Sequence, residues 1–532
     1  MKHRSVLLLL LVLVLITFRS DAQLVQWLNA APVGWDMNYE MPGHLIKASR
    51  NGLVSVARQF GDGMSFGQDV FNSVMVERID PATGLPQGGC PMTDSVLVES
   101  MVVDDDGITY VAGRFMGAIQ FCDGSTLAGS PGFLDTDLFI AAFGEDNFHP
   151  LWSRNLSLSH PDAQRVPAME IDVTGNVWYG LEEFSVLHLI SLDDAGNDVD
   201  ERTINGTRAL GGFSFDPSNN VFVSGSTGQN EGGLTFGGLS VPVPETYMMF
   251  VLHMDVNGNG DWARLAHDIT FSAPDIMAGG YGEAFVSGMI MDSTSWGDVH
   301  FHGPNWVFDV FLTRVSATGE FTWGTETSPE GQVFSGNMRR SKGPSLACDG
   351  NANVYLTGVV SGQVDWGNGV VSDAIETFLD AHTVVCFAND GTPLWQKTSD
   401  PGAMNAQNVS CDAAGNVFIS THTLGTFSFL PDLVNVAAEQ AFADARIAAQ
   451  STGVLDRPVQ GTLRVWPVPS ATSIHVSNMA ECVGYRIISS TGSRLLRGTL
   501  VRGVSRIDLA GLASGPYTVV LDDGRVSRFI KE

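Results

Sequence analysis

The sequence predicts an all-β protein, a seven-bladed β-propeller followed by a small C-terminal β-sandwich. Of its 532 residues, 44% are hydrophobic and only 16% are charged, so the chain can bury a large core. Its 59 glycines stand between short runs rich in Val and aromatic residues, which is typical of short strands joined by tight turns. One turn pattern recurs through residues 47–420, and a different strand pattern begins at residue 462.

Residues 1–22 have the pattern of a secretory signal peptide. Lys2 and Arg4 precede a run of thirteen residues, 6–18, that contains a single polar residue, and small residues flank the expected cleavage site. Thirteen residues are too few to cross a bilayer, which takes about 20 apolar residues, and no other run approaches that length. We therefore expect an exported mature chain that starts at Gln23 and has no membrane span.

The net charge restricts the classes of partner that the protein can bind, and the cysteines bear on the compartment in which it folds. Removing residues 1–22 takes away three basic residues and one acidic residue, so the formal net charge falls from −29 to −31. Such a surface repels phosphate backbones, so no nucleic-acid partner is expected, whereas divalent cations and basic partners remain open. All six cysteines lie in the exported part of the chain, where disulfides can persist: Cys90, Cys122, Cys348, Cys386, Cys411 and Cys482. The sequence does not show which of them pair with one another.

A repeated hairpin predicts the blades. Each copy has an apolar run, Asp, two residues, Gly or Asn, and a second apolar run, as in EIDVTGNVWYG (170–180) and SFDPSNNVFVSG (214–225). In such turns Asp and Asn side chains bond to nearby backbone and Gly takes a positive φ, so each copy is a β-hairpin. The seven Asp positions lie 44 to 70 residues apart, at Ser49, Asp104, Asp172, Asp216, Gly279, Asp349 and Asp412.

Two further motifs complete a four-stranded unit. A Phe-Gly or Trp-Gly element follows most copies, as at Trp296-Gly297, and a second hairpin ends in Trp, as in VFLTRVSATGEFTW (310–323). Two hairpins per repeat and seven repeats describe a β-propeller, whose blades bury their faces against one another. The last repeat lacks its Trp, so we expect the N-terminal segment LVQWLNA (24–30) to supply the outer strand of the last blade and close the ring.

This hairpin pattern resembles the SBBP family of bacterial β-propeller repeats, which have D-x-x-G-N-x-Y-V-x-G and F-G elements. The resemblance covers residues 45–450 and implies a propeller over residues 23–449. It implies no particular activity, because none is generally assigned to that family.

A separate module is expected at residues 462–532, after a linker at 450–461. Its strand-like runs are broken by turns at Gly492 and Gly515, which favours a small β-sandwich. The segment VWPVP places two prolines in an apolar run, and proline is confined to the margins of sheets because it cannot donate to the strand ladder.

This module resembles the C-terminal sorting domain of type IX secretion, of the Por type, type A. VWPVP (465–469) looks like its V-Y-P-N-P opening, residues 485–494 like Y-x-I-x-D-x-x-G-R, residues 507–517 like I-D-L-x-x-L-x-x-G-x-Y, and residues 528–531 like its basic apolar tail. The resemblance implies export to the medium or outer cell surface, with the type IX machinery as partner. The motif positions would be Pro467, Pro469, Gly492, Gly515, Tyr517 and Lys531.

Two departures from that family bear on how the machinery would handle the module. Val468 stands in place of the usual Asn, and Ser490 in place of the usual Asp. The alternative is an adhesive sandwich that stays attached to the propeller.

The strongest metal candidate is the segment DVNGNGDW (255–262), which resembles the start of a Ca²⁺ loop. Ala266 stands where a bidentate Glu would be needed, and sister repeats have hairpin turns at the same place, so a turn is favoured over weak Ca²⁺ binding. The candidate ligands are Asp255, Asn257, Asn259 and Asp261.

Other motifs favour structural roles. GMSFG (63–67) matches the nucleophile elbow, but sister repeats place varied polar residues at its serine position. His300 and His302 would share one strand face, yet no third ligand is near, and VDDD (103–106) is a turn with an acidic face. ATGEFTW (317–323) looks like the tryptophan-docking motif of pyrroloquinoline-quinone propellers, although its irregular spacing favours blade contacts.

The sequence therefore predicts a secreted or cell-surface propeller that binds or adheres to an unidentified extracellular ligand without catalysing a reaction. No catalytic residue and no cofactor is assigned, apart from the Ca²⁺ alternative. The binding surface would be a loop-bearing face or the central channel. The alternatives are an extracellular propeller enzyme, either a quinone-dependent dehydrogenase or a hydrolase, and a structural surface-layer component.

Overall fold

The computed structural model describes residues 23–532, apart from 33–42, 67–68, 133–134, 146–147, 268–272, 292, 304–308, 328–335, 375–379, 430–432, 450–464, 467–469, 490–493 and 522–525. The chain divides into two compact units, Met1–Ser451 and Thr452–Glu532. The predicted signal peptide and linker lie outside the described residues.

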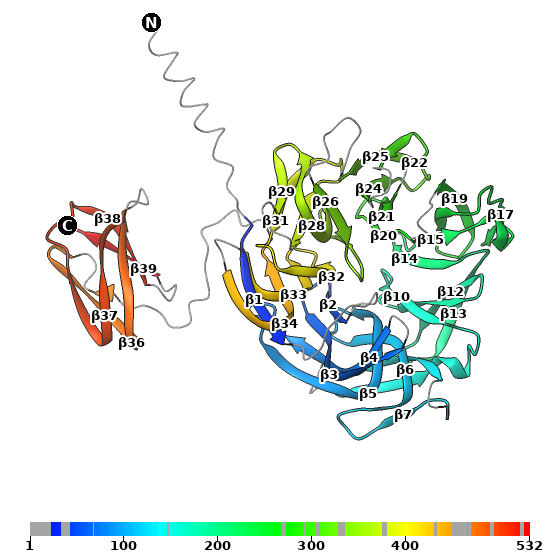
Figure 1. The fold of residues 1–532 in the computed structure, drawn as a ribbon, viewed down its shortest axis with the longest axis horizontal. Coiled ribbons are helices and arrows are strands. Elements are labelled where there is room, and N and C mark those ends of the chain that lie inside the picture. The colour runs from blue at the N-terminus through cyan, green and yellow to red at the C-terminus, as the bar shows by residue number, and fades with distance from the viewer. Residues whose placement is uncertain are drawn as a thin grey trace, which may run out of the picture. The chain divides into compact units, whose positions relative to one another are not determined.

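The first unit is a β-propeller, as the sequence predicts. Its antiparallel sheets surround a common centre, and their first strands lie nearest to it (Figure 1). One sheet has the order β10 (Arg165–Ile171), β11 (Val177–Glu183), β12 (Val186–Leu192), β13 (Asp198–Asn205), β16 (Leu234–Phe236) and β17 (Leu239–Val241). The next has the order β14 (Ala209–Phe215), β15 (Val221–Thr227), β18 (Met248–Met254) and β19 (Gly260–His267).

Two further sheets carry small additional strands. One has the order β20 (Asp275–Ala278), β21 (Ala284–Ile290), β24 (Asp309–Val315) and β25 (Phe321–Glu326), and a separate hairpin is formed by β22 (Ser293–Trp296) and β23 (Val299–His302). In the other, β28 (Val354–Gly367) pairs with β26 (Gly336–Arg340), β27 (Leu346–Cys348), β29 (Val370–Ala374) and β30 (Ala381–Phe387), and β30 pairs with β31 (Pro393–Thr398).

An eight-stranded sheet joins what the sequence predicts as the first two blades. Strand β5 is 18 residues long; its first part pairs with β4 and its second part with β6, with an irregularity between Thr93 and Ser95. The number of blades therefore stays a prediction. The sheet contains β2 (His44–Ala48), β3 (Val54–Phe66), β4 (Asp69–Ile79), β5 (Pro86–Val103), β6 (Thr109–Gln120), β7 (Thr126–Ala128), β8 (Thr136–Phe143) and β9 (Pro150–Asn155).

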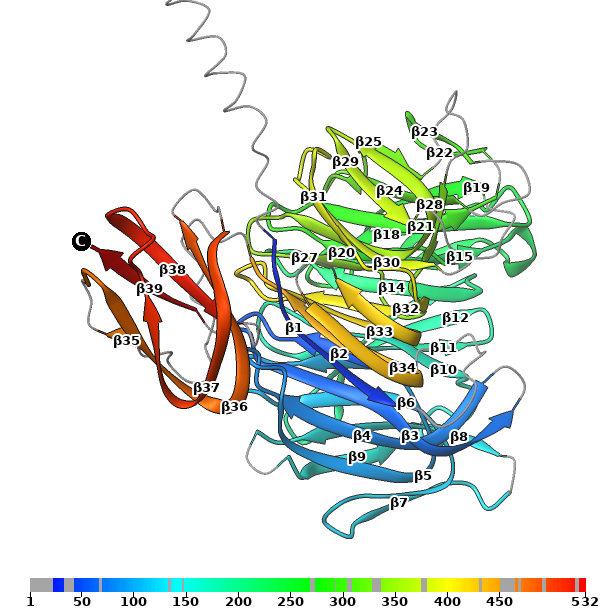
Figure 2. The ribbon, with the colours of Figure 1, turned by 60° about the vertical axis from the view of Figure 1, so that its left-hand side comes forward.

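The predicted closure of the ring is confirmed. The last sheet of the propeller has the order β32 (Ala403–Cys411), β33 (Val417–Phe429), β34 (Leu433–Ile447) and β1 (Val25–Pro32). Strand β1 runs antiparallel to β34 with Val25 opposite Ile447, and Figure 2 shows the two side by side. This pairing covers an edge that would otherwise expose unpaired backbone groups.

The hairpin turns form as their residue types predict. The carboxylate of Asp172 accepts hydrogen bonds from the backbone N–H groups of Thr174 (2.8 Å) and Asn176 (3.0 Å), and Gly175 has a φ of 91°. The same side-chain to backbone pattern recurs at Asp216, Asp349 and Asp412. Because each turn satisfies its own polar groups, it joins two apolar strands without leaving buried donors unpaired.

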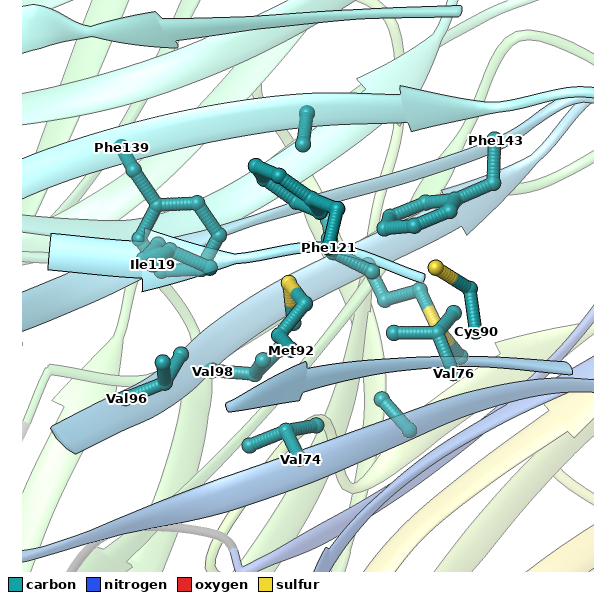
Figure 3. Packing of buried hydrophobic residues seen from close by; sticks show 14 of the residues in the cluster. Val74, Val76, Cys90, Met92, Val96, Val98, Ile119, Phe121, Phe139 and Phe143 are labelled. Atoms are coloured by element: carbon teal, nitrogen blue, oxygen red, sulfur yellow. The ribbon is translucent and has the colours of Figure 1, made fainter. Parts of the chain in front are cut away.

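The core lies between adjacent sheets, where strands are apolar on both faces. Every residue of β18 is buried, whereas the first four residues of the outer strand β13 are exposed. In the cluster drawn in Figure 3, Phe121 and Phe143 lie beside Cys90. A disulfide joins Cys90 to Cys122 and resolves one of the open cysteine pairings.

We expect this disulfide to stabilise the propeller. It closes a loop over a sequence separation of 32 residues, and a crosslink of that length contributes about 2–4 kcal/mol, chiefly by restricting the unfolded chain. The double replacement Cys90→Ala and Cys122→Ala should lower the free energy of unfolding by this amount in urea titrations followed by tryptophan fluorescence. Equal unfolding midpoints for the double variant and the wild type would contradict the expectation.

Tryptophans of the outer hairpins dock on the hairpin of a neighbouring sheet. The indole N–H of Trp323 donates to the carbonyl of Asn389 (2.9 Å), and the ring covers Gly391, where a Cβ would meet the ring at 2.6 Å. Each covered glycine has a positive φ. The same contact occurs in the pairs Trp27–Gly84, Trp152–Gly196 and Trp262–Gly319.

The second unit is built on one five-stranded antiparallel sheet. Its buried core includes Ile474, Ile487, Tyr517 and Phe529. The long strands β36 and β37 bend, with an irregularity in their pairing between Asn478 and Cys482 (Figure 2). The strands are β35 (Val465–Trp466), β36 (Ser473–Ser489), β37 (Arg494–Asp508), β38 (Gly515–Leu521) and β39 (Val526–Lys531).

Candidate functional site

A cavity of about 610 Å³ lies at the centre of the propeller. Its walls come from the first strands of the sheets, among them β2, β10, β14, β20 and β26, which Figure 1 shows around the centre. This volume falls within the range of pockets that hold small molecules, roughly 300–1,000 Å³. The apolar part of the lining includes Leu45, Met101, Met169, Ile276, Met277, Met289 and Leu346.

A second cavity of about 430 Å³ adjoins the first at the turn ends of the same strands. Lys47, Glu170, Met277 and Leu346 line both cavities, so these side chains lie where the two meet. The acidic turn predicted at 103–106 lines the second cavity, and burial raises the pKa of the Asp104 carboxyl there.

The larger cavity has a different charge balance from the chain. Its lining has five basic and three acidic side chains, whereas the whole chain carries a formal charge of −29. The charged residues are Lys47, Glu99, Arg165, Glu170, Asp275, Arg339, Arg340 and Lys342. The lining of this cavity therefore has an excess of basic side chains, although the protein as a whole is acidic.

One part of this charge is held in a buried network around Glu99. Its carboxylate accepts from the guanidinium of Arg114 (2.8 Å), from that of Arg165 (3.3 Å) and from the backbone N–H of Val166 (2.8 Å). Burial by itself lowers the pKa of Arg165, but the carboxylates of Glu99 and Glu182 outweigh it and raise that pKa. Glu99 therefore joins β5 to the first strand of the next sheet, β10.

Similar contacts join other neighbouring sheets. Asp275 of β20 accepts from Arg340 (3.0 Å) and from the backbone N–H of Ser345 (2.8 Å). The side chain of Asn408 in β32 accepts from the backbone N–H of Ile46 in β2 (3.0 Å). These contacts fix the positions of the first strands around the cavity. Most of the charged side chains that line the cavity are therefore already bonded to other groups of the protein.

Lys47 and Glu170 stand apart from these networks. Within the described residues, no ion pair shorter than 4.0 Å involves either side chain. Burial lowers the pKa of the Lys47 ammonium, and the Glu170 carboxylate is the strongest of the charges that oppose this. Burial likewise raises the pKa of Glu170, opposed first by Lys47. The two groups therefore act on each other across the cavity without touching.

Sequence reasoning missed these two residues, although a signal was present. The position two residues before the Asp of each repeated turn lines the second cavity in every copy, and only Lys47 and Glu170 are charged there. The other copies have Val102, Ser214, Met277, Ala347 and Ser410. Aligning the seven hairpins on their turns would have found this position.

The Ca²⁺ candidate is a hairpin turn between β18 and β19. The carboxylate of Asp255 accepts from the side-chain amide of Asn259 (2.9 Å) and from the backbone N–H groups of Asn259 (2.8 Å) and Asn257 (2.9 Å), and these hydrogen bonds, the side-chain one foremost, lower its pKa. The carboxylate of Asp261 instead lies 2.8 Å from the imidazole of His253. No group of three or more His, Cys, Asp or Glu side chains suited to a metal occurs in the described part of the chain. Weak Ca²⁺ binding here stays a prediction.

The other predicted motifs lie on regular strands. Ser65 is inside β3, opposite Val70 of β4, rather than on a strand-to-helix turn. His300 and His302 are exposed on β23; His300 bonds to Ser295 (2.7 Å), and His302 lies 3.8 Å from Glu326. The docking of Trp262 on Gly319 and of Trp323 on Gly391 accounts for the ATGEFTW motif through packing.

The predicted sorting positions fall partly on described residues. Gly515 begins β38, and the hydroxyl of Tyr517 donates to the carbonyl of Ala513 (2.7 Å) while its ring stacks on Phe529. Lys531 ends β39 opposite Gly515. Pro467, Pro469 and Gly492 lie outside the described residues. In the residues that the structure describes, no helix is both long and apolar enough to cross a membrane.

Comparisons with known proteins return distant structures only. No family model matches the chain, and no curated protein matches it. It is similar to the WD40 repeats of RRP9 at 10% identity and a TM-score of 0.32, over 66% of this chain and 94% of that one. It is also similar to PorZ, a surface component of the type IX secretion system of Porphyromonas gingivalis, at 11% identity and a TM-score of 0.31, over 92% and 70%.

A third similar structure is the apocarotenoid oxygenase of Synechocystis in its Trp149Ala form, at 10% identity and a TM-score of 0.31, over 80% of this chain and 92% of that one. Likenesses at this level carry no functional argument, so the function must be inferred from the residues of this chain.

Proposed function

We propose that this chain is an exported β-propeller that acts in the medium or at the outer cell surface as a non-enzymatic binding protein, with its ligand in the central channel. The observation that carries the binding role is the cavity of about 610 Å³, which is lined by apolar side chains together with five basic and three acidic ones. The contacts of Glu99, Asp275 and Asn408 hold its strands in place before any ligand arrives, which lowers the ordering cost of binding.

The two ends of the sequence support the proposed export. Residues 1–22 have the signal-peptide pattern, and residues 462–532 resemble a type IX sorting domain. We expect the type IX machinery to be the partner of this second unit. Its predicted motif positions Gly515 and Tyr517 belong to a folded sheet, in which they pair with Lys531 and Phe529.

Intact-mass and terminal-peptide mass spectrometry of protein from the medium and surface of the native host tests the export. A mature form that starts at Gln23 and lacks the residues from 462 onward would support it. A full-length chain that keeps Lys531 and stays inside the cell would contradict it.

The binding role is tested by screening amino acids, peptides, sugars and organic acids for shifts in melting temperature. The wild type is compared with Met277→Trp, which fills the channel where the two cavities meet. Ligands that stabilise the wild type should lose their effect in the variant. Equal shifts in both proteins would place binding outside the channel and contradict the proposal.

A further inference from the structure

Seven of the eight charged side chains that line the channel divide into two groups. Glu99 with Arg165, and Asp275 with Arg340, hold neighbouring sheets together, and Arg339 pairs with Asp380. Lys47 and Glu170, on β2 and β10, line the channel without an ion-pair partner inside 4.0 Å among the described residues. Both are only partly buried, and both line the larger and the smaller cavity.

A charge without an ion-pair partner in contact is costly in a narrow cavity, because burial removes water from it and the opposite charge across the cavity offsets that loss only from a distance. Burial shifts the pKa values of Lys47 and Glu170 in the directions that favour their neutral forms. A molecule that carries one negative and one positive group would satisfy both side chains at once. A molecule with a single charge would satisfy one and leave the other unpaired.

Flexible apolar side chains line the same cavity as the pair. Met101, Met169, Met277 and Met289 line the same cavity, together with Leu346. Methionine side chains are flexible and polarizable, so they adjust to apolar groups of different shapes.

Resting on the proposed binding role, we propose that the channel binds a small zwitterion with an apolar side chain, an α-amino acid or a short peptide. Its carboxylate accepts hydrogen bonds from the Lys47 ammonium, its ammonium donates to the Glu170 carboxylate, and its apolar part packs on the methionines. Charge-assisted contacts of this kind contribute more than neutral hydrogen bonds, so both charges of the ligand should matter.

Isothermal titration calorimetry on the mature chain tests this proposal with L-leucine and L-leucyl-L-leucine as probes. Two analogues of leucine, 3-methylbutylamine and 4-methylpentanoate, each keep one charge. At least one zwitterion should bind at least about tenfold more tightly than either analogue. Lys47→Met and Glu170→Gln should each weaken that binding by at least about tenfold.

The double variant Lys47→Met and Glu170→Gln is the folding control. Replacing both unpaired charges should leave the melting temperature unchanged or raise it, while abolishing zwitterion binding. A purely structural pair would instead lower the melting temperature on removal and leave probe binding untouched, which would overturn the proposal.

The remaining outcomes distinguish a failure of the zwitterion proposal from a failure of the channel as the binding site. If 4-methylpentanoate binds as tightly as leucine, and Lys47→Met weakens it while Glu170→Gln does not, the channel is a binding site but not for a zwitterion. If the probes bind and neither variant has an effect, the zwitterion proposal fails, and Met277→Trp then decides whether the probes bind in the channel: unchanged binding in that variant would contradict the channel as the binding site as well. Failure of both probes to bind at ~10 mM would overturn the zwitterion proposal.

Discussion

Glu99→Ala should lower the free energy of unfolding by about 3–5 kcal/mol, because it removes a fully buried carboxylate together with its hydrogen bonds to two partly exposed guanidinium groups and to one buried backbone N–H. The Glu99 side chain has no solvent exposure and accepts hydrogen bonds from Arg114, Arg165 and the backbone of Val166. Alanine would remove three contacts that join β5, β6 and β10. Urea unfolding followed by tryptophan fluorescence measures the effect.

Glu245→Ala is the matched control. The Glu245 carboxylate also lies in an ion pair, 2.6 Å from His267, but its side chain is 52% exposed. Exposed pairs contribute only about 0–1 kcal/mol, so this variant should unfold almost as the wild type does. Similar losses for the two variants would show that the Glu99 network does not hold the sheets together.

Gly391→Ala should destabilise the propeller by about 2–5 kcal/mol. Gly391 has a φ of 86°, which costs an alanine about 1–2 kcal/mol, and its new Cβ would lie 2.6 Å from the ring of Trp323. Relieving that overlap requires the docked indole to move, at a further cost of about 1–3 kcal/mol. Thermal melts of variant and wild type measure the difference.

Gly175→Ala separates the two costs. Gly175 also ends a hairpin turn and has a φ of 91°, but nothing lies within 4 Å of its added Cβ. Gly175→Ala should therefore lower the free energy of unfolding only by the cost of placing an alanine at a positive φ. Equal destabilisation by the two variants would mean that the tryptophan contact adds nothing, contrary to the docking arrangement.

The propeller class was predictable because its signals are local. The turn at Asp172 needs only Asp, Gly and Asn at fixed spacing, and the apolar runs beside it become strands buried on both faces. The closing strand was predictable because the last repeat lacks a tryptophan that Trp27 supplies, and the indole of Trp27 donates to Pro81 as the others do to their neighbours.

What the sequence left open depends on contacts between distant segments. The partner of Cys90 was open among five cysteines, and it depends on how β5 and β6 pair. Strand β5 serves two predicted blades although Asp94, a residue type common in turns, stands between Met92 and Ser95, because its first part pairs with β4 and its second part with β6. Lys47 and Glu170 lie 123 residues apart in the sequence, and only the folded propeller places them around one cavity.

Binding in the central channel is the main functional claim, and a crystal structure of the mature chain soaked with L-leucine tests it most directly. We expect the amino acid in the larger cavity, with its carboxylate at Lys47, its ammonium at Glu170 and its side chain against Met277. An empty channel, at a leucine concentration that saturates the protein in calorimetry, would contradict the claim.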